Sequence, residues 1–226
     1  QVVYEEKSNL NTAEEYFYRG YDKSDKGDYY GAVSDYTKAI EINPNYAEAY
    51  SNRGIGKNVL KDYYGAISDY TKAIEINPNF ARSYYNRGNT KYDLKDYNGA
   101  ISDYTKAIEI NPNFAKSYSN RGIGKYYLKD YYGAISDYTK AIEINPNFAR
   151  SYYNRGNTKY DLKDYNGAIS DYTKAIEINP NFAICYVNRG KAKYGLKDYY
   201  GAISDYTKVI EINPNDAEAY SNRGDS

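Results

Sequence analysis

The 226-residue sequence contains no histidine, no tryptophan and no methionine, and it has a single cysteine, Cys185. The lack of histidine excludes the common zinc sites and the catalytic triads that depend on an imidazole base. One cysteine cannot form a disulfide within the chain, so the sequence does not indicate a redox compartment. We therefore expect no enzymatic activity, no bound cofactor and no metal.

An excess of charge of one sign is also lacking, because 30 Lys and Arg residues balance 30 Asp and Glu residues. No overall field draws the chain to nucleic acid or to an anionic membrane. No run of 18 apolar residues occurs, and residues 1–11 have no apolar segment typical of a signal peptide. We expect a soluble protein with no nucleic-acid partner and no membrane insertion. Its compartment stays open, either cytoplasmic or outside the cell after removal of a leader.

Proline is scarce, and its placement is regular. All six prolines lie 34 residues apart, each in an Ile-Asn-Pro-Asn context. A fixed period of this length is typical of repeat architectures. The period predicts an N-terminal extension at 1–12, six repeats, and the start of a seventh unit at 217–226; the repeats span 13–46, 47–80, 81–114, 115–148, 149–182 and 183–216.

The second half of each repeat has the pattern of a helix, which we call helix B. In the second repeat, Ala66, Tyr70 and Ala73 recur with helical spacing. Asp62 is a suitable N-cap, and Pro78 biases Asn77 away from helical geometry, so helix B should end there.

The first half of each repeat predicts a second helix, helix A. Asn45 is a suitable cap for its start, and Tyr50, Gly54 and Leu60 form its inward stripe. Gly54 removes a side chain where two helices would otherwise be held apart, so we expect the helices to pack closely.

These residues resemble the tetratricopeptide repeat: Tyr50, Arg53, Gly54 and Lys57 in helix A, then Ala66, Tyr70, Ala73 and Pro78. The pattern departs from the family at Tyr50, Arg53 and Lys57, where the family favours Trp, Leu and Tyr. The resemblance covers all six repeats. It implies an all-α fold, a right-handed superhelix (α-solenoid) of stacked antiparallel helix pairs, which serves as a protein-protein interaction scaffold.

Comparison of the repeats shows that the duplicated unit was a pair. Residues 81–114 are identical to 149–182, and 47–80 differ from 115–148 at only four positions, Glu48/Lys116, Ala49/Ser117, Asn58/Tyr126 and Val59/Tyr127. Helix B is nearly invariant, whereas helix A carries differences that share one helical face.

In the tetratricopeptide family this face of helix A lines the concave groove where partner peptides lie. The resemblance therefore implies a partner-binding groove formed by Glu48, Asn58, Arg82, Tyr85, Asn89, Tyr92, Lys116, Asn120, Ile123, Tyr126, Tyr127, Arg150, Tyr153, Asn154, Asn157, Tyr160, Lys191 and Tyr194. The alternative is drift at exposed positions. The many tyrosines favour a groove, because tyrosine supplies contact area and a hydroxyl at low entropic cost.

Charge along the predicted groove is uneven, with Glu48 acidic and Arg82, Lys116 and Arg150 basic. An acidic or C-terminal ligand is therefore conceivable. Family members that grip a C-terminal carboxylate do so with Lys, Arg and Asn residues. Asn89, Asn120 and Arg150 match that pattern in repeats three to five, whereas Tyr85 and Asn154 depart from it.

Each repeat also has Arg and Lys four residues apart, as at Arg53 and Lys57, which would repel on a helix. We predict that Arg53 pairs with Asp69 of helix B, and likewise in the other repeats. The alternative is a basic ladder that faces a ligand.

Four further motifs receive structural interpretations. Gly54 to Lys57 lies within helix A and lacks the remaining residues of a phosphate-binding loop. Asp22 to Gly27 lacks the acidic ligands of a calcium loop and predicts a helix end and turn. Arg223-Gly224-Asp225 extends a recurring Asn-Arg-Gly by one residue, and Cys185 should be a packed thiol of little reactivity.

The sequence thus predicts a scaffold that binds a peptide segment of a protein partner. The alternative is a structural protein that self-assembles by end-to-end or dimeric stacking, a homo-oligomer through the repeat ends.

Overall fold

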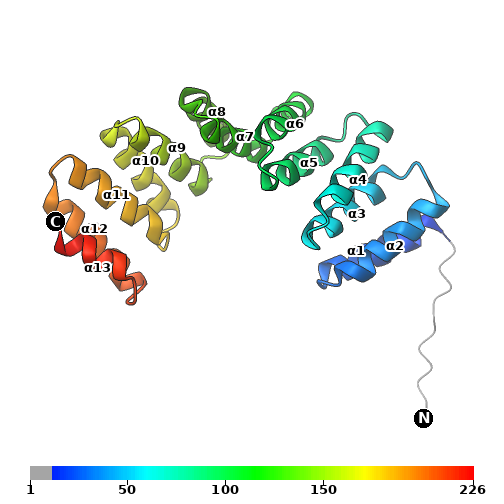
Figure 1. Ribbon diagram of the computed structural model, residues 1–226, viewed down its shortest axis with the longest axis horizontal. Coiled ribbons are helices and arrows are strands. Elements are labelled where there is room, and N and C mark those ends of the chain that lie inside the picture. Colours follow the sequence, from blue (N-terminus) through cyan, green and yellow to red (C-terminus); the bar gives the residue numbers. More distant parts are fainter. Residues whose placement is uncertain (1–11) are drawn as a thin grey trace, which may run out of the picture. The chain divides into compact units, whose positions relative to one another are not determined.

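The computed structural model describes residues 12–226, and over this range it consists of α-helices joined by short turns (Figure 1). Helix A of successive units forms α1 (Ala13–Asp25), α3 (Ala47–Val59), α5 (Ala81–Asp93), α7 (Ala115–Tyr127), α9 (Ala149–Asp161), α11 (Ala183–Gly195) and α13 (Ala217–Gly224). Helix B forms α2 (Tyr29–Ile42), α4 (Tyr63–Ile76), α6 (Tyr97–Ile110), α8 (Tyr131–Ile144), α10 (Tyr165–Ile178) and α12 (Tyr199–Ile212). The predicted all-α fold of helix pairs is confirmed. Apart from Thr12, the predicted N-terminal extension lies outside the described residues.

The chain divides into two compact units, Gln1–Pro112 and Asn113–Ser226. The first unit holds α1 to α6, and the second holds α7 to α13. Within each unit, every helix A packs against the helix B that follows it, and that helix B packs against the next helix A. The core of each unit is therefore a series of interfaces between neighbouring helices, as expected for a repeat array.

Helix B begins and ends where the sequence predicts. Asp62 is the N-cap of α4, and its side chain accepts a hydrogen bond from the backbone N–H of Gly65 at 3.0 Å. Asn77 leaves the helix in an extended conformation directly before Pro78. An aspartate caps each of the six B helices in the same way, which fixes the start of each one.

The predictions for the ends of helix A were wrong in detail. Tyr46, not Asn45, is the N-cap of α3, and it makes no side-chain capping bond. Asn45 instead donates its backbone N–H to Oδ1 of Asn43 at 3.1 Å. An aromatic residue stands at this cap because it packs on the core, where Tyr46 contacts Phe17. At the other end, Leu60 lies just beyond the helix, at its C-cap.

The helices pack closely around a buried tyrosine in helix B. Tyr70 is only 2% exposed, and a Cβ atom added at Gly54 would lie 2.7 Å from its ring. The predicted role of Gly54 in close helix packing is therefore confirmed. Two motif interpretations are also confirmed, since Gly54 to Lys57 lies within α3 and α1 ends at Asp25, before a turn that contains Gly27.

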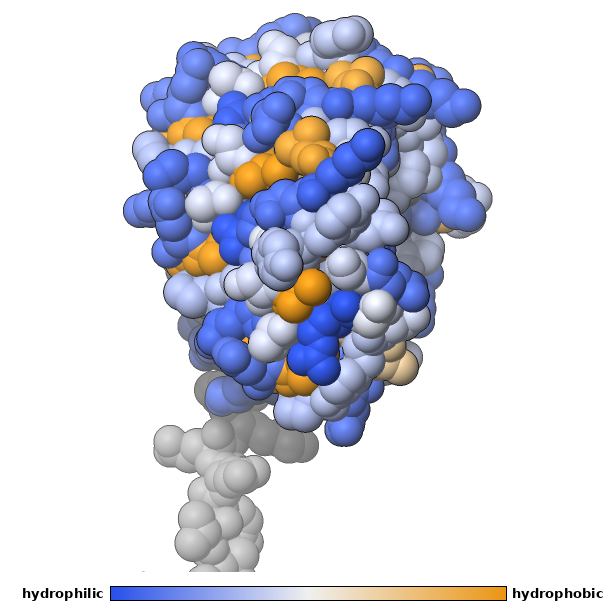
Figure 2. Space-filling model, turned by 90° about the vertical axis from the view of Figure 1, so that its left-hand side faces the viewer, coloured by the Kyte–Doolittle hydropathy of each residue, from blue (hydrophilic) through white to orange (hydrophobic). Residues whose placement is uncertain are grey.

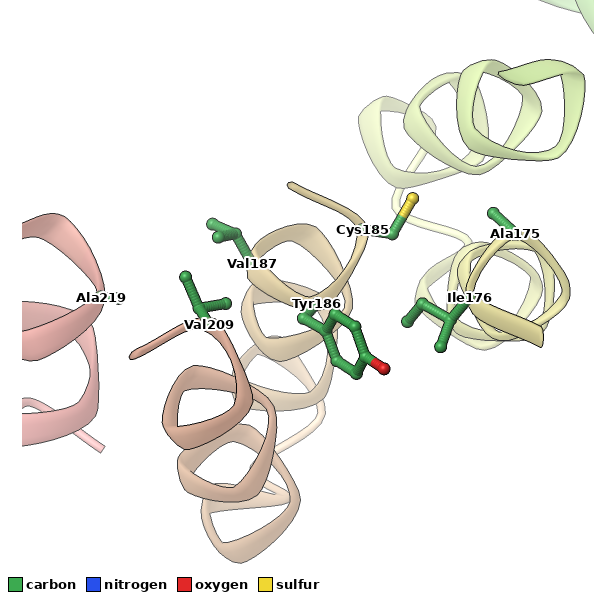
Figure 3. Close-up of a cluster of buried hydrophobic side chains, with 7 residues drawn as sticks. All are labelled: Ala175, Ile176, Cys185, Tyr186, Val187, Val209 and Ala219. Carbon is green, nitrogen blue, oxygen red and sulfur yellow. The ribbon is translucent and has the colours of Figure 1, made fainter. Parts of the chain in front are cut away.

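Cys185 lies in a buried apolar cluster of the second unit (Figure 3). The cluster joins α10, α11, α12 and α13 through Ala175, Ile176, Cys185, Tyr186, Val187, Val209 and Ala219. Burial raises the pKa of the Cys185 thiol to about 12, against a small opposing effect of Arg189. The thiol is packed and protonated at neutral pH, as the sequence predicts.

Candidate functional site

An ion pair with a buried aspartate joins helix A to helix B in each complete repeat. In repeat two, Arg53 donates from Nε and Nη2 to the two carboxylate oxygens of Asp69 at 2.8 and 2.7 Å, and Lys57 lies 2.8 Å from the same carboxylate. The predicted pairing of Arg53 with Asp69 is confirmed. The same arrangement recurs in the other five repeats, at Arg19 with Asp35, Arg87 with Asp103, Arg121 with Asp137, Arg155 with Asp171 and Arg189 with Asp205.

The shared carboxylate also explains how Arg and Lys tolerate one another at four-residue spacing. In repeat one, burial raises the pKa of Asp35, but hydrogen bonds from Arg19 and Lys23 outweigh burial and hold the pKa below its usual range. Arg53 donates a further hydrogen bond to Thr37 of the preceding repeat at 3.2 Å. These arginines therefore link helices within and between repeats, so the ligand-facing ladder is not needed to explain them.

The basic residues of the predicted groove lie at the starts of the A helices. Arg82, Lys116 and Arg150 are each the second residue of their helix, and all three are exposed. Within the described residues, no carboxylate lies within ion-pair distance of any of them. A cation in the first helical turn opposes the helix dipole, at a cost of about 0.3 to 1 kcal/mol. Glu48 occupies this position in α3, where an acidic residue is favourable.

Two tyrosines of the predicted groove are half-buried and take part in packing. Tyr85 contacts the ring of Tyr104 with 6.0 Å between centroids, and Tyr153 contacts Tyr172 and Phe182 at 6.2 and 5.3 Å. In repeats two and four the same position holds Ser51 and Ser119, which are buried and hydrogen-bonded to Ser83 and Ser151 of the next repeat. This position is thus a junction between neighbouring helices as well as part of the face.

Several amides of the predicted groove satisfy hydroxyls of the scaffold. Asn89 accepts a hydrogen bond from Tyr104 and Asn157 accepts one from Tyr172, each at 2.8 Å. Asn58 accepts one from Thr90 at 3.0 Å. Asn120, Ile123 and Asn154 are half-buried on the same helices, and the side-chain nitrogen of Asn154 is buried without a hydrogen-bond partner.

The tyrosines near the ends of the A helices contact the ring of the first residue of the following helix B in a tilted or edge-to-face arrangement. The ring centroids of the pairs Tyr92 with Tyr97, Tyr126 with Tyr131, Tyr160 with Tyr165 and Tyr194 with Tyr199 are 5.3 to 5.5 Å apart. Tyr127 is 52% exposed and also contacts Tyr126 edge to face. The aromatic end of the face is therefore preorganised by contacts of the protein with itself.

A cavity of about 230 Å³ opens at this aromatic end in the second unit. Three successive A helices line it, and α9 contacts both α7 and α11. The lining consists of Tyr126, Asn157, Tyr160, Asp161, Asn188 and Lys191, with Tyr172 of helix B. Four of these, Tyr126, Asn157, Tyr160 and Lys191, belong to the predicted groove.

Sequence reasoning missed Asn188 and Tyr172 because the asparagine recurs in repeats two to six and the tyrosine in all six repeats, and recurrence was taken as a sign of a scaffold role. Asp161 lies on the variable face, but the aspartate in repeat three is identical and gave no reason to select it. The signal that could have found Asp161 is its neighbour in helix A of the preceding repeat. This neighbour is Tyr126 for Asp161 and Asn58 for Asp93 of repeat three.

Hydrogen bonds fix the walls of the cavity. Tyr126 donates its hydroxyl to Oδ2 of Asp161, and Asn188 donates from its side chain to Oδ1 of Asn157 at 2.9 Å. Burial, together with the bond to Asp161, raises the pKa of the Tyr126 phenol well above its usual range. Lys191 forms an ion pair with Glu218 of α13 at 2.8 Å, which offsets its charge.

Stacked helix pairs that present a face of variable side chains on an invariant framework define a helical repeat scaffold. The chain belongs to the tetratricopeptide repeat family. A model described as tetratricopeptide repeat matches residues 81–114, 115–148, 149–182 and 183–216, and a second TPR repeat model matches 20–55 and 60–95. The family resemblance drawn from the sequence is confirmed. Members of this family are generally scaffolds without catalytic activity, which bind protein or peptide partners.

Solved structures share the fold over most of the chain. Pseudomonas aeruginosa pilF superposes with a TM-score of 0.81 at 19% identity and covers 95% of this chain and 97% of its own. A crystal structure of MamA gives a TM-score of 0.69 at 27% identity, with 76% of this chain and 94% of that chain covered. YrrB, described as a TPR protein with an unusual peptide-binding site, gives a TM-score of 0.70 at 23% identity, with 84% of this chain and 97% of that chain covered. The search of curated protein sequences found no match.

The surface at the α11 to α13 end of the molecule is mostly polar, with apolar residues in separate small patches (Figure 2). Within residues 12–226, no helix is both long enough and apolar enough to cross a membrane.

Proposed function

We propose that the variable face of helix A binds a peptide segment of a protein partner. In the second unit, the binding surface comprises the unpaired cations Lys116 and Arg150 at the starts of two A helices and the tyrosine-lined cavity at the other end of these helices. The cations and the cavity residues Tyr126, Asn157, Tyr160 and Lys191 lie at positions that differ between repeats, whereas the framework that carries them is nearly constant.

The observation that carries this proposal is the position of the differences between repeats two and four. Three of the four differing pairs, Glu48/Lys116, Asn58/Tyr126 and Val59/Tyr127, lie on the face of helix A that the cavity and the cations occupy. Lys116 and Arg150 also stand where a cation destabilises the helix. Residues that weaken a local structural rule without a compensating contact are a sign of a functional surface. The peptide-binding site named for YrrB, a protein of the same fold, is consistent with such a role.

The proposal is tested by selection of peptides from a displayed random library on the purified chain. A matched variant returns repeat four to the face of repeat two through Lys116→Glu, Tyr126→Asn and Tyr127→Val. Because repeat two carries these residues in the same fold, the variant is expected to fold. We expect selected peptides to bind the wild type at about micromolar Kd and the variant at least tenfold more weakly.

Tyr132→Asn is the control variant, because Tyr132 is 78% exposed on helix B and repeats three and five carry asparagine there. It should bind the same peptides as the wild type. Equal binding to the triple variant, or failure to select any peptide, would contradict the proposal. Sedimentation over a concentration range shows whether self-association through the repeat ends competes for the same face.

A further inference from the structure

The cavity distinguishes two repeats of identical sequence. In repeat five, Asp161 accepts the hydroxyl of Tyr126 and forms one wall of the cavity. In repeat three, the corresponding residue is Asp93. Helix A of the preceding repeat there carries Asn58 in place of Tyr126. The side-chain oxygen of Asn58 accepts a hydrogen bond from the hydroxyl of Thr90 at 3.0 Å, and Asn58 makes no hydrogen bond to Asp93. The chemistry of the cavity therefore depends on one residue contributed by repeat four.

The walls of the cavity retain hydrogen-bond acceptors. Asp161 uses only Oδ2 within the described residues, so its other carboxylate oxygen is unbonded. Asn188 uses its nitrogen for Asn157 and Tyr153, and its side-chain oxygen has no donor among the described residues. Tyr126 and Tyr160 line the same cavity as these acceptors. A carboxylate, an amide oxygen and two phenol faces together favour a cation.

We propose that this cavity binds the guanidinium group of an arginine side chain in the bound peptide. This inference rests on the peptide-binding function proposed above and names the side chain that the aromatic end selects. Arginine suits the site better than lysine, because its planar group stacks on phenol rings while it donates two hydrogen bonds to a carboxylate. The volume of about 230 Å³ is smaller than that of typical sites for drug-sized ligands and matches a single side chain.

An anion is less favoured at this cavity. The only cation in its lining is Lys191, whose charge Glu218 offsets at 2.8 Å. The unpaired cation Arg150 lies on the same helix as Tyr160, but their separation of ten positions corresponds to about 15 Å along the axis. This separation exceeds the screening length of about 8 Å at physiological ionic strength. Acidic groups of a ligand are therefore expected near Lys116 and Arg150, away from the cavity.

The test is a titration, followed by NMR of the tyrosine rings, with two blocked amino acids. The probes are N-acetyl-arginine methylamide and its neutral isostere N-acetyl-citrulline methylamide. We expect the arginine probe to bind the wild type with a Kd of about 1 mM, from the affinity that a ligand of its size attains. Citrulline should bind at least tenfold more weakly, since it lacks the charge. Equal binding of the two probes would overturn the proposal, as would stronger binding of the matching glutamate probe.

Three variants locate the effect. Asp161→Asn removes the charge without changing the shape, and Tyr126→Asn removes one aromatic wall; each should weaken the arginine probe at least fivefold. Tyr126→Asn is expected to fold, because the asparagine would meet Thr158 as Asn58 meets Thr90 in the other pair. Asp93→Asn is the matched control in the identical repeat and should leave the affinity unchanged. Retained binding in Asp161→Asn, or equal loss in Asp93→Asn, would show that the arginine lies elsewhere.

The test separates this inference from the proposed function. If library peptides bind the face but show no arginine preference, and the blocked arginine does not bind, peptide binding stands and the arginine site is wrong. If the blocked arginine binds at Asp161 but no peptide is selected, the cavity stands and the general peptide-binding function is contradicted.

Discussion

Repeats three and five have the same 34 residues, yet they present different surfaces. Their internal contacts agree closely. Tyr104 donates to Asn89 and Tyr172 donates to Asn157, both at 2.8 Å. The corresponding arginines donate through Nη2 to the aspartates of helix B at 2.7 and 2.6 Å. The sequence of a repeat therefore determines its internal structure.

The differences arise from the neighbouring repeats. Thr90 of repeat three bonds Asn58 of repeat two, whereas Thr158 of repeat five bonds only a carbonyl of its own helix. In an array whose units contact only their neighbours, each surface is a property of two or three adjacent repeats. The surface that each repeat presents is therefore determined by the order of the repeats as well as by their sequence.

The largest expected effect tests whether the two repeats are internally equivalent. Asp103→Asn and Asp171→Asn each leave a partly buried Arg and Lys beside a neutral amide in place of the buried carboxylate. Each substitution should lower the free energy of unfolding by about 3 kcal/mol. Guanidinium denaturation followed by helical circular dichroism measures the loss. A difference above about 1 kcal/mol between the variants would show that the internal contacts are not equivalent.

A smaller effect isolates the contribution of the neighbour. Thr90→Ala removes a hydrogen bond to Asn58 that has no counterpart at Thr158. Both Thr90→Ala and Thr158→Ala remove a buried threonine side chain. Thr90→Ala should therefore cost about 1 kcal/mol more. The same denaturation experiment provides the measurement, and Thr90→Ala in an Asn58→Ala background is the control, since there the extra cost should vanish. Equal costs in the original background would remove Asn58 from the comparison.

The sequence predicted the features of the fold that depend on local chemistry. The aspartate caps, the helix end before Pro78 and the pairing of Arg53 with Asp69 follow from residues within one repeat, and each is confirmed. The predicted cap at Asn45 failed because a tertiary contact decides that position. The aromatic ring of Tyr46 packs on the core, and this contact outweighs a capping bond.

The candidate site was harder to predict, because its parts come from different repeats. The variable face directed attention to Tyr126, Asn157, Tyr160 and Lys191, all of which line the cavity. The asparagine at position 188 recurs in repeats two to six, yet only the contact of Asn188 with Asn157 brings it into the wall. A repeat alignment compares equivalent positions and does not contain such contacts between non-equivalent positions.

The smallest effect concerns the ionisation of Tyr126 in repeat four, whose counterpart beside repeat three is Asn58 of repeat two. Burial and the bond to Asp161 favour the neutral phenol, so the pKa in the folded protein exceeds the value of about 10 in the unfolded chain. Stability that depends on this group is complete below pH 10 and is lost as the pH rises above 10 toward the folded pKa. Tyr126→Phe should reduce the alkaline loss, with less than about 1 kcal/mol change at pH 8.

Titration of the Tyr126 ring by NMR in wild type, Asp161→Asn and Asp93→Asn assigns the cause. Asp161→Asn should lower the pKa of Tyr126, because the amide removes the negative charge that opposes ionisation. Asp93→Asn changes the identical residue of the identical repeat and should leave the pKa unchanged. An equal shift in both variants would mean that the carboxylate acts through the general charge of the protein and not through contact with Tyr126. The comparison between repeats three and five would then hold for packing but not for electrostatics.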